Sequence, residues 1–356
     1  MHGHVKDVEK LPIPVYQEPM RALRLLKGIY VNLKAPEEIE FKPFSMEGSV
    51  ASREVIAKTI YTAISPGTEV AAYAGEPPLR PGSAYPRLLG YSNVARVVRV
   101  GTSVKKVRVG DLIFTNQSHR SLYKIAAAEI LATVPKALNP KYATCAELYA
   151  FGRTAIANAA PRRGSAIAVI GLGTLGLAAI EQSASQGFFS IAFTNRKRNA
   201  HTAKILGAAC CLRKSDKRVS EKLAKAAPQG IGTVILTTNS WADWDLALRI
   251  ASKNGTICVL GFPGRNEGAP PFNPLHPHLF YVKKLKIVSV DRGNNPPSRK
   301  KSDIKKNHDA ILALMSKGKL RPSRLISNTY SFQEIEAAYR QLLSKKRTAL
   351  TYVLKW

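Results

Sequence analysis

The spacing of the hydrophobic residues changes from strand-like to helical between residues 135 and 155. Between residues 21 and 135, short apolar runs alternate with polar positions, as in Glu54 to Thr62, and glycine or proline ends most runs. Such alternation is typical of half-buried β-strands. From about Tyr142 the apolar positions recur at helical spacing instead. The N-terminal part is therefore predicted to be β-rich.

The part that follows alternates apolar runs with helical segments, which predicts an α/β unit on a doubly wound parallel sheet. Strands are predicted at 166–170, 190–194, 232–237 and 256–260, and helices at 174–186, 198–206, 217–227 and 241–252, with Asn254-Gly255 ending the last helix. The end of the chain is predicted to hold a strand at 286–290, a helix at 303–317, a capping box of Ser331 and Glu334 before a helix through Leu343, and a strand at 348–354.

A glycine motif follows the first strand of this unit. The G-x-G-x-x-G pattern allows a tight turn at its first glycine, backbone approach to a pyrophosphate at its second and close helix packing at its third. The helix that begins there offers free N–H groups to the phosphates. The sequence therefore predicts a Rossmann dinucleotide site. Its members are Gly171, Leu172, Gly173, Thr174, Leu175 and Gly176, with Thr238 and Gly261 after later strands.

The second strand of the unit indicates which dinucleotide binds. An NAD site places Asp or Glu about 20 residues after the glycines, to bind the ribose 2′-hydroxyl. This chain has no acid there and instead reads Asn195-Arg196-Lys197-Arg198. Three cations favour a 2′-phosphate, so NADP is predicted in preference to NAD. The alternative is a solvated basic loop.

The net charge of the chain limits the functional classes to which it can belong. The 356 residues contain 54 Lys and Arg against 24 Asp and Glu, a net charge of +30. Such a surface attracts anionic substrates or polyanions, or it serves solubility alone. Lys and Arg residues are most concentrated between Arg196 and Lys225 and between Lys283 and Lys306. No aromatic-interleaved basic motif accompanies them, which disfavours nucleic acid without excluding it.

The cellular context is predicted from what the sequence lacks. Residues Met1 to Val15 are polar and show no signal peptide, and no apolar run is long enough to span a membrane. The four cysteines form no C-x-x-C pair. We therefore expect a cytoplasmic protein with a small-molecule substrate, and a homodimer is left open.

Several motifs together resemble the medium-chain dehydrogenase/reductase superfamily from about residue 50 to the end. They are Pro86 to Tyr91, Val97 to Gly101, Val109 to Ile113, Gly171 to Gly176 and Val259 to Gly261. The resemblance implies a GroES-like catalytic domain over residues 1–155, a Rossmann domain over 156–290 and a return to the catalytic domain over 291–356. It places the active site in the cleft between the domains.

The chain departs from the zinc-binding members of that superfamily. Their G-I-C-G-T-D motif is replaced by Ile64 to Glu69, with Pro66 at the cysteine, and their G-H-E motif is replaced by Gly90-Tyr91-Ser92. The cysteine-rich lobe after Gly110-Asp111 is also missing. Pro and Ser are not zinc ligands, so no metal is predicted. The Ser65 to Glu69 segment resembles a narrower branch that includes bacteriochlorophyllide hydroxyethyl dehydrogenases.

Without zinc, another group must stabilise the charge that develops on a substrate oxygen. The candidates are Tyr91, Thr68, His119 and Glu147. Each has a plain alternative: a packed aromatic, a turn residue, a surface histidine and a buried helix pair, respectively. An NADP-dependent alcohol/ketone oxidoreductase is the leading hypothesis. A reductase of activated C=C bonds and a basic RNA-associated protein with a Rossmann platform stay open.

Overall fold

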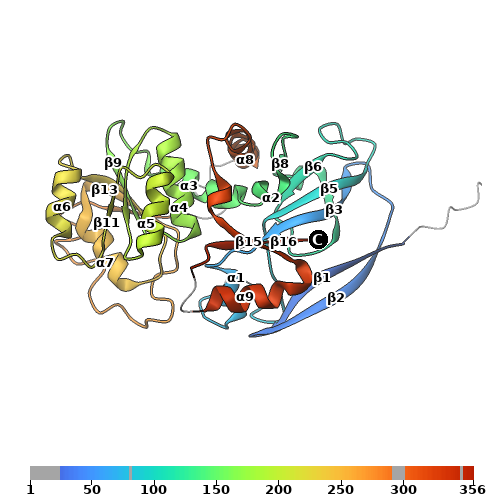
Figure 1. Cartoon of the computed structure of the whole chain (residues 1–356), viewed down its shortest axis with the longest axis horizontal. Coiled ribbons are helices and arrows are strands. Elements are labelled where there is room, and N and C mark those ends of the chain that lie inside the picture. The colour runs from blue at the N-terminus through green and yellow to red at the C-terminus, as the bar shows by residue number, and fades with distance from the viewer. Residues whose placement is uncertain (1–24, 80–81, 291–300, 345–347) are drawn as a thin grey trace, which may run out of the picture.

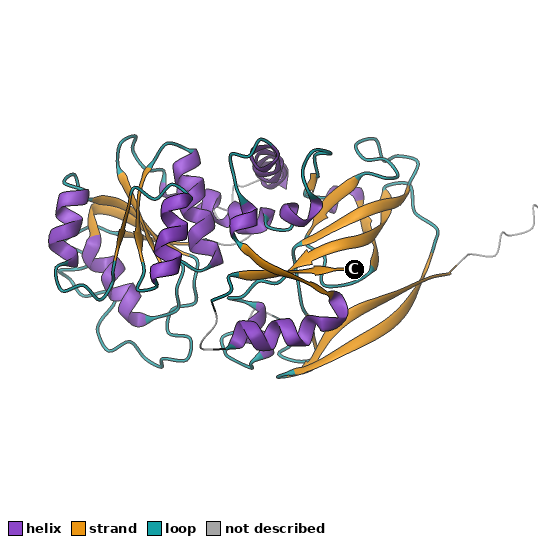
Figure 2. Ribbon diagram, viewed as in Figure 1, coloured by secondary structure: helices purple, strands orange, loops and turns teal. Residues whose placement is uncertain are grey.

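Two β-structured halves lie side by side in the molecule, with helices between them (Figures 1 and 2). The computed structural model describes residues 25–79, 82–290, 301–344 and 348–356. One half is a six-stranded parallel sheet, and the other is built mainly from antiparallel strands. The expected α/β architecture, GroES-like plus Rossmann, is confirmed. The segment Met1–Val15 and residues 291–300 of the cation-rich stretch from Lys283 to Lys306 lie outside the described residues.

The parallel sheet has the strand order β11-β10-β9-β12-β13-β14. Alternate residues of β9 enter two different cores, because successive side chains of a strand point to opposite faces. Ile167 and Val169 pack with helices α3, α4 and α5, whereas Ala168 and Ile170 pack with α6 and α7. The strands are β9 (Ala166–Ile170), β10 (Phe189–Phe193), β11 (Cys210–Leu212), β12 (Ile231–Leu236), β13 (Ala251–Val259) and β14 (Lys286–Ser289), and the helices are α3 (Ala146–Ala159), α4 (Thr174–Ser185), α5 (Lys197–Ile205), α6 (Val219–Ala226) and α7 (Trp241–Ile250).

The other half holds a seven-stranded and a three-stranded sheet. The larger has the order β15-β16-β3-β5-β6-β8, with β7 also paired to β3, and the smaller has the order β2-β1-β4. The strands are β1 (Leu25–Ala35), β2 (Glu38–Glu47), β3 (Glu54–Ala63), β4 (Arg87–Leu88), β5 (Asn93–Val100), β6 (Leu112–Thr115), β7 (Leu122–Ala126), β8 (Ala132–Thr133), β15 (Ile326–Ser331) and β16 (Thr351–Lys355), and the helices are α1 (Glu69–Tyr73), α2 (Pro140–Ala143), α8 (Lys301–Ser316) and α9 (Ile335–Leu343).

The end of the chain joins the antiparallel half, since β16 pairs with β3. The boundaries proposed at residues 155 and 290 stay predictions. Helix α4 makes two of the polar contacts that tie the halves together. Thr174, the first residue of α4, donates a hydrogen bond to the Leu350 carbonyl at 2.8 Å. Arg321 pairs with the buried Glu181 of α4 at 2.8 Å. No helix among the described residues is long and apolar enough to cross a membrane.

One predicted boundary is wrong. The Asn254-Gly255 pair predicts a helix end, but α7 already ends at Ile250 and β13 begins at Ala251. Asn254 has a φ of +62° inside the strand, and the pairing of β12 with β13 jumps there from Ala251 to Thr256. Residues with left-handed backbone serve strand bulges as well as helix ends, and here the Asn-Gly pair serves a bulge. Strand β15 is not predicted by the sequence pattern.

Candidate active site

The predicted dinucleotide residues lie along one edge of the parallel sheet. Gly171, Asn195, Thr238 and Gly261 closely follow the C-terminal ends of β9, β10, β12 and β13, respectively. Because all these strands run parallel, their C-terminal ends meet at the same edge. This is the edge at which doubly wound sheets bind their ligands.

Backbone packing explains the glycines of the first turn. Gly171 has a φ of +89°, which favours glycine. A Cβ on Gly176 would lie 1.8 Å from the Gly171 carbonyl oxygen, so only glycine lets α4 approach the strand this closely. At Gly173 a Cβ would meet nothing within 4 Å, which leaves open space where a pyrophosphate would pass.

A second observation at this edge fits a nicotinamide cofactor. The Thr238 hydroxyl is buried and has no hydrogen-bond partner among the described residues. A Cβ on Gly261 would lie 2.1 Å from the Thr238 carbonyl oxygen. This edge of the sheet thus offers the Thr238 hydroxyl, which is unpaired among the described residues, where the backbones of Thr238 and Gly261 pack closely. The residues present fit the cofactor.

The four residues predicted to face a 2′-phosphate are all exposed. Asn195, Arg196, Lys197 and Arg198 span the loop after β10 and the first turn of α5. Asn195 accepts a hydrogen bond from the Ser215 backbone N–H at 3.1 Å, which fixes the loop. In the second cation-rich stretch, Lys283 has a structural role, because its ammonium donates to the carbonyls of Leu248, Arg249 and Ala251 at the end of α7.

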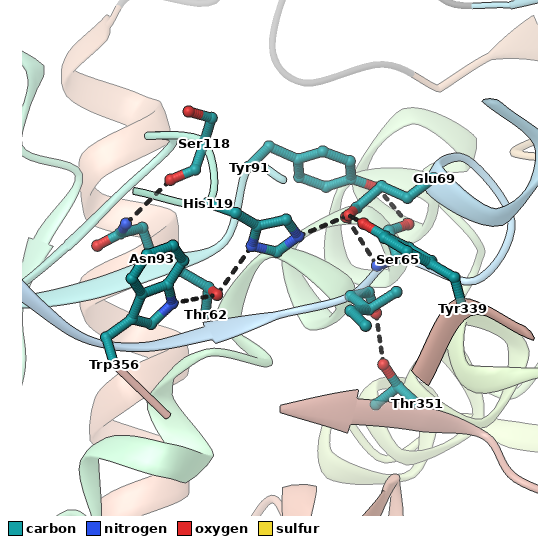
Figure 3. A network of polar contacts seen from close by, with 11 residues as sticks. Thr62, Ser65, Glu69, Tyr91, Asn93, Ser118, His119, Tyr339, Thr351 and Trp356 are labelled. Carbon is teal, nitrogen blue, oxygen red and sulfur yellow. Dashed lines mark hydrogen bonds and ion pairs between the residues drawn. The ribbon is translucent and has the colours of Figure 1, made fainter. Parts of the chain in front are cut away.

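A buried polar network forms the candidate catalytic centre in the antiparallel half (Figure 3). Glu69, at the start of α1, is 2% exposed and accepts three hydrogen bonds. Its donors are His119 Nε2 at 2.8 Å, Tyr339 Oη at 2.7 Å and the Ser65 backbone N–H at 2.8 Å. His119 lies between β6 and β7 and Tyr339 lies on α9. One carboxylate thus joins three separate segments of the chain.

The donors of this network can be assigned in order. The indole N–H of Trp356 can only donate, and it points to the Thr62 hydroxyl at 2.9 Å. The Thr62 hydroxyl lies 2.8 Å from His119 Nδ1. With Thr62 accepting from Trp356, its own hydroxyl proton can point to His119 Nδ1, and Nε2 then donates to Glu69. In this arrangement each of these donors meets an acceptor.

Tyr91 lies beside this network. It is 6% exposed, and its hydroxyl donates to the Ser65 hydroxyl at 2.5 Å. Gly90, with a φ of +87°, allows the approach of His119, because a Cβ there would lie 2.7 Å from the His119 backbone nitrogen. The Gly90-Tyr91 step therefore places both side chains. The half-buried Ser65 is the polar group that connects Tyr91 to the turn before α1.

The other sequence-predicted residues are placed differently. Thr68 precedes α1, is half-buried and makes no capping hydrogen bond. His119 is fully buried with both ring nitrogens engaged, so it faces no cleft. Glu147 on α3 is 3% exposed and pairs with His308 of α8 at 2.9 Å. The geometry therefore gathers Tyr91, His119 and the Thr68 turn, and separates Glu147 from them.

Sequence reasoning missed five members of the network, and Thr62 of β3 is one of them. Ser65 and Glu69 stand within the motif whose cysteine is replaced, so a polar signal was present there. Tyr339 and Trp356 come from the distant end of the chain, and nothing local marks them. Only the pairing of β16 with β3 brings Trp356 to Thr62.

Comparisons with known proteins agree with this fold. A family model described as zinc-binding dehydrogenase matches residues 174–311. The sorbitol dehydrogenase of Bacillus subtilis is 20% identical, over 74% of this chain and 80% of that protein. An uncharacterized zinc-type alcohol dehydrogenase-like protein of Haemophilus influenzae is 25% identical, over 76% and 82%. The chain is thus similar to members of the medium-chain dehydrogenase/reductase superfamily.

Solved structures show the same fold over nearly the whole chain. L-idonate 5-dehydrogenase from Escherichia coli gives a TM-score of 0.78 at 13% identity, covering 94% of this chain and 99% of that one. A putative zinc-binding dehydrogenase from Sinorhizobium meliloti, bound to NADP, gives 0.75 at 17% identity, covering 93% and 100%. The relatives and solved structures that these comparisons name are dehydrogenases, which supports an oxidoreductase.

The descriptions of these relatives name zinc, but the side chains of the buried network do not fit a zinc ion. Within the described ranges, no three His, Cys, Asp or Glu side chains form a group that could hold a metal. The two ligand-type side chains present, Glu69 and His119, are hydrogen-bonded to each other. Pro66, Tyr91 and Ser92 occupy the positions where the zinc motifs carry ligands, and none of them is an ordinary zinc ligand.

The Glu147–His308 pair makes stability depend on pH. Burial disfavours the charged imidazolium, but the hydrogen bond and charge of Glu147 outweigh it, so the pKa of His308 is raised above 6.5. A raised folded-state pKa stabilises the protein fully below the unfolded value, and this stabilisation is lost as pH rises through the folded value. We expect the urea midpoint to fall between pH 6 and pH 9, and Glu147→Gln to flatten that fall. An equal slope in the variant would contradict this assignment.

Proposed function

We propose that the protein is an NADP(H)-dependent oxidoreductase that interconverts an alcohol and a ketone without zinc. The relatives named as sorbitol and alcohol dehydrogenases support an alcohol as the substrate class. The observation that carries the proposal is the Tyr91–Ser65 hydroxyl pair, at 2.5 Å, in which Tyr91 aligns with a ligand position of the zinc motifs and Ser65 is next to another. A pair of hydroxyls can stabilise and protonate a substrate oxygen.

The two hydroxyls have different roles in this proposal. When bound, the reduced nicotinamide supplies the hydride to the carbonyl carbon, and the carbonyl oxygen then gains negative charge. Ser65 donates its proton to that oxygen, Tyr91, already donating to Ser65, replaces the proton that Ser65 gives up, and Tyr91 then takes a proton from solvent. Glu69 holds the Ser65 backbone N–H and so fixes the turn from which the hydroxyl points. In the oxidation direction the same protons move the opposite way.

Product analysis separates this proposal from the reduction of C=C bonds. The protein should be incubated with NADPH and matched pairs of a saturated ketone and its α,β-unsaturated analogue. We expect the alcohol as product from both members, with the C=C bond retained. Saturated ketones accumulating from the enones would transfer the assignment to an enone or quinone reductase.

Changing Arg196→Asp is expected to weaken NADPH binding by about tenfold or more. The guanidinium can pair with a 2′-phosphate in a bidentate manner, and tenfold corresponds to about 1.4 kcal/mol. NADH affinity should hardly change, because NADH has no such phosphate. Titration of both coenzymes by fluorescence measures this effect. Lys204→Asp, at the far end of α5, is the matched control for charge. Equal NADH and NADPH affinities in the unchanged protein would contradict NADP preference.

Elemental analysis of the purified protein is expected to find well below one zinc per chain. The reason is the ligand set described above, which leaves no three donors together among the described residues. Activity should survive dialysis against 1,10-phenanthroline, since tight zinc sites lose both metal and activity to chelators. About one zinc per chain, with activity restored by zinc alone, would show that the proposal is wrong.

A further inference from the structure

A single buried arginine connects the two halves of the protein next to the catalytic network. Arg265 lies in the loop after β13, at the same sheet edge as Gly261. Its Nη1 donates to the Gly67 carbonyl at 2.7 Å and its Nη2 donates to the Pro78 carbonyl at 2.7 Å. Gly67 belongs to the turn between Ser65 and Glu69. The guanidinium therefore stands beside the residues proposed to handle the substrate oxygen.

No carboxylate of the described residues forms an ion pair with this arginine, although the charge of Glu76 acts on it from farther away. Arg265 is 6% exposed, yet its hydrogen-bond partners among the described residues are two neutral carbonyls. Its Nε is buried and donates to nothing in the described part of the chain. A guanidinium has five N–H donors in a planar fork, and buried charges are ordinarily paired. Three of the donors here are left for another acceptor.

The residues around Arg265 keep its guanidinium group in a fixed position, as a ligand-binding group requires. It lies 4.7 Å from the centre of the Phe262 ring, whose backbone N–H is itself fixed by Asn239. Burial lowers the pKa of Arg265, and the charge of Glu76 acts against that. Arginine nevertheless stays charged in proteins. Gly67 and Pro78 are exposed residues, so the two backbone partners of the arginine lie near the protein surface.

The position along the sheet indicates which molecule would meet it. The adenosine end of the cofactor belongs near β10, where the Asn195–Arg198 cations lie, and the pyrophosphate belongs near β9. Arg265 follows β13, two strands beyond β9 in the opposite direction. The substrate, not the cofactor phosphates, therefore comes closest to this guanidinium.

We propose that Arg265 recognises an anionic group of the substrate, a carboxylate or a phosphate, which replaces the Gly67 and Pro78 carbonyls on the guanidinium. Both groups accept two parallel hydrogen bonds from arginine. The assignment rests on the proposed function for the identity of the neighbouring reaction centre. It makes the substrate an anionic alcohol or ketone, with its charged end at Arg265 and its reacting oxygen at Ser65 and Tyr91.

Calorimetric titration of the full chain, saturated with NADP⁺, tests this proposal with malonate and inorganic phosphate as probes and malonamide as the neutral analogue. We expect saturable binding of at least one anion and none of malonamide. Arg265→Gln should weaken that binding at least tenfold and leave NADP⁺ affinity within twofold. Arg108→Gln, an exposed arginine with the same loss of charge, should bind the anion as the unchanged protein does. The tighter anion identifies the class.

The contrary outcomes are distinct. Equal anion binding by Arg265→Gln, or equal loss in Arg108→Gln, would leave Arg265 as a bridge between domains only. Absence of binding by both anions would also overturn the proposal. If Arg265→Gln does not fold, Arg265→Lys decides, because it keeps the charge but loses the fork and should bind the anion several-fold more weakly. The same titration without cofactor tests Arg265 even if NADP⁺ preference fails, so the two proposals fail separately.

Discussion

Tyr91→Phe is expected to lower kcat by about 10²–10³ while the affinity for NADPH stays within about twofold. Loss of one donor to a developing oxyanion typically has an effect of this size. The ring is retained, so packing in this buried position is nearly unchanged. The change removes the proton donor to Ser65 and leaves the cofactor edge untouched. Single-turnover hydride transfer, followed by NADPH absorbance, measures the chemical step directly.

Two controls isolate the Tyr91 hydroxyl. Tyr85→Phe removes another hydrogen-bonded phenol, which donates to the Ala72 carbonyl at 2.6 Å, outside the network. It should reduce stability to a similar extent without changing kcat. Ser65→Ala should repeat most of the Tyr91→Phe loss, and the double variant should lose little more, because residues that act as a unit are not additive. Full activity in Tyr91→Phe would remove Tyr91 from the mechanism.

The parallel sheet was the part most open to prediction from the sequence. Strand β9 has its predicted bounds because both of its faces are buried, which produces an uninterrupted apolar run. The glycine turn was equally visible, since Gly171 and Gly176 answer local backbone requirements. By contrast, β15 reads as polar and half-exposed, and its pairing with β16 decides its conformation. Local pattern alone could not supply that information.

The sequence predicted two residues of the candidate site, but it did not predict which other residues surround them. Tyr91 and His119 were found because they stand near displaced ligand motifs or between strands. The role of His119 could not be read from its loop, because Thr62 and Glu69 engage its two nitrogens from segments over 45 positions away. In the sequence Arg265 is one of 54 Lys and Arg residues, and nothing else marks it. Its contact with Gly67 exists only after the two halves meet.

Glu69→Ala is expected to reduce the free energy of unfolding of the antiparallel half by about 3–5 kcal/mol. The carboxylate accepts from His119, Tyr339 and the Ser65 backbone, and its removal leaves these buried donors unsatisfied. Each such donor costs about 1–3 kcal/mol, so three of them account for a loss of this size. This is a large share of the roughly 5–15 kcal/mol that stabilises a typical native protein.

Urea unfolding followed by Trp356 fluorescence measures this effect in the relevant half. Trp241 and Trp244 lie on α7, so changing both to Phe leaves Trp356 as the single tryptophan reporter. In that background Glu69→Gln should lose less than Glu69→Ala, because its amide oxygen still accepts, although its NH₂ group opposes one of the donors. A midpoint in Glu69→Ala equal to that of the background would mean that water replaces the carboxylate fully. The network would then order the Ser65 turn without stabilising the domain.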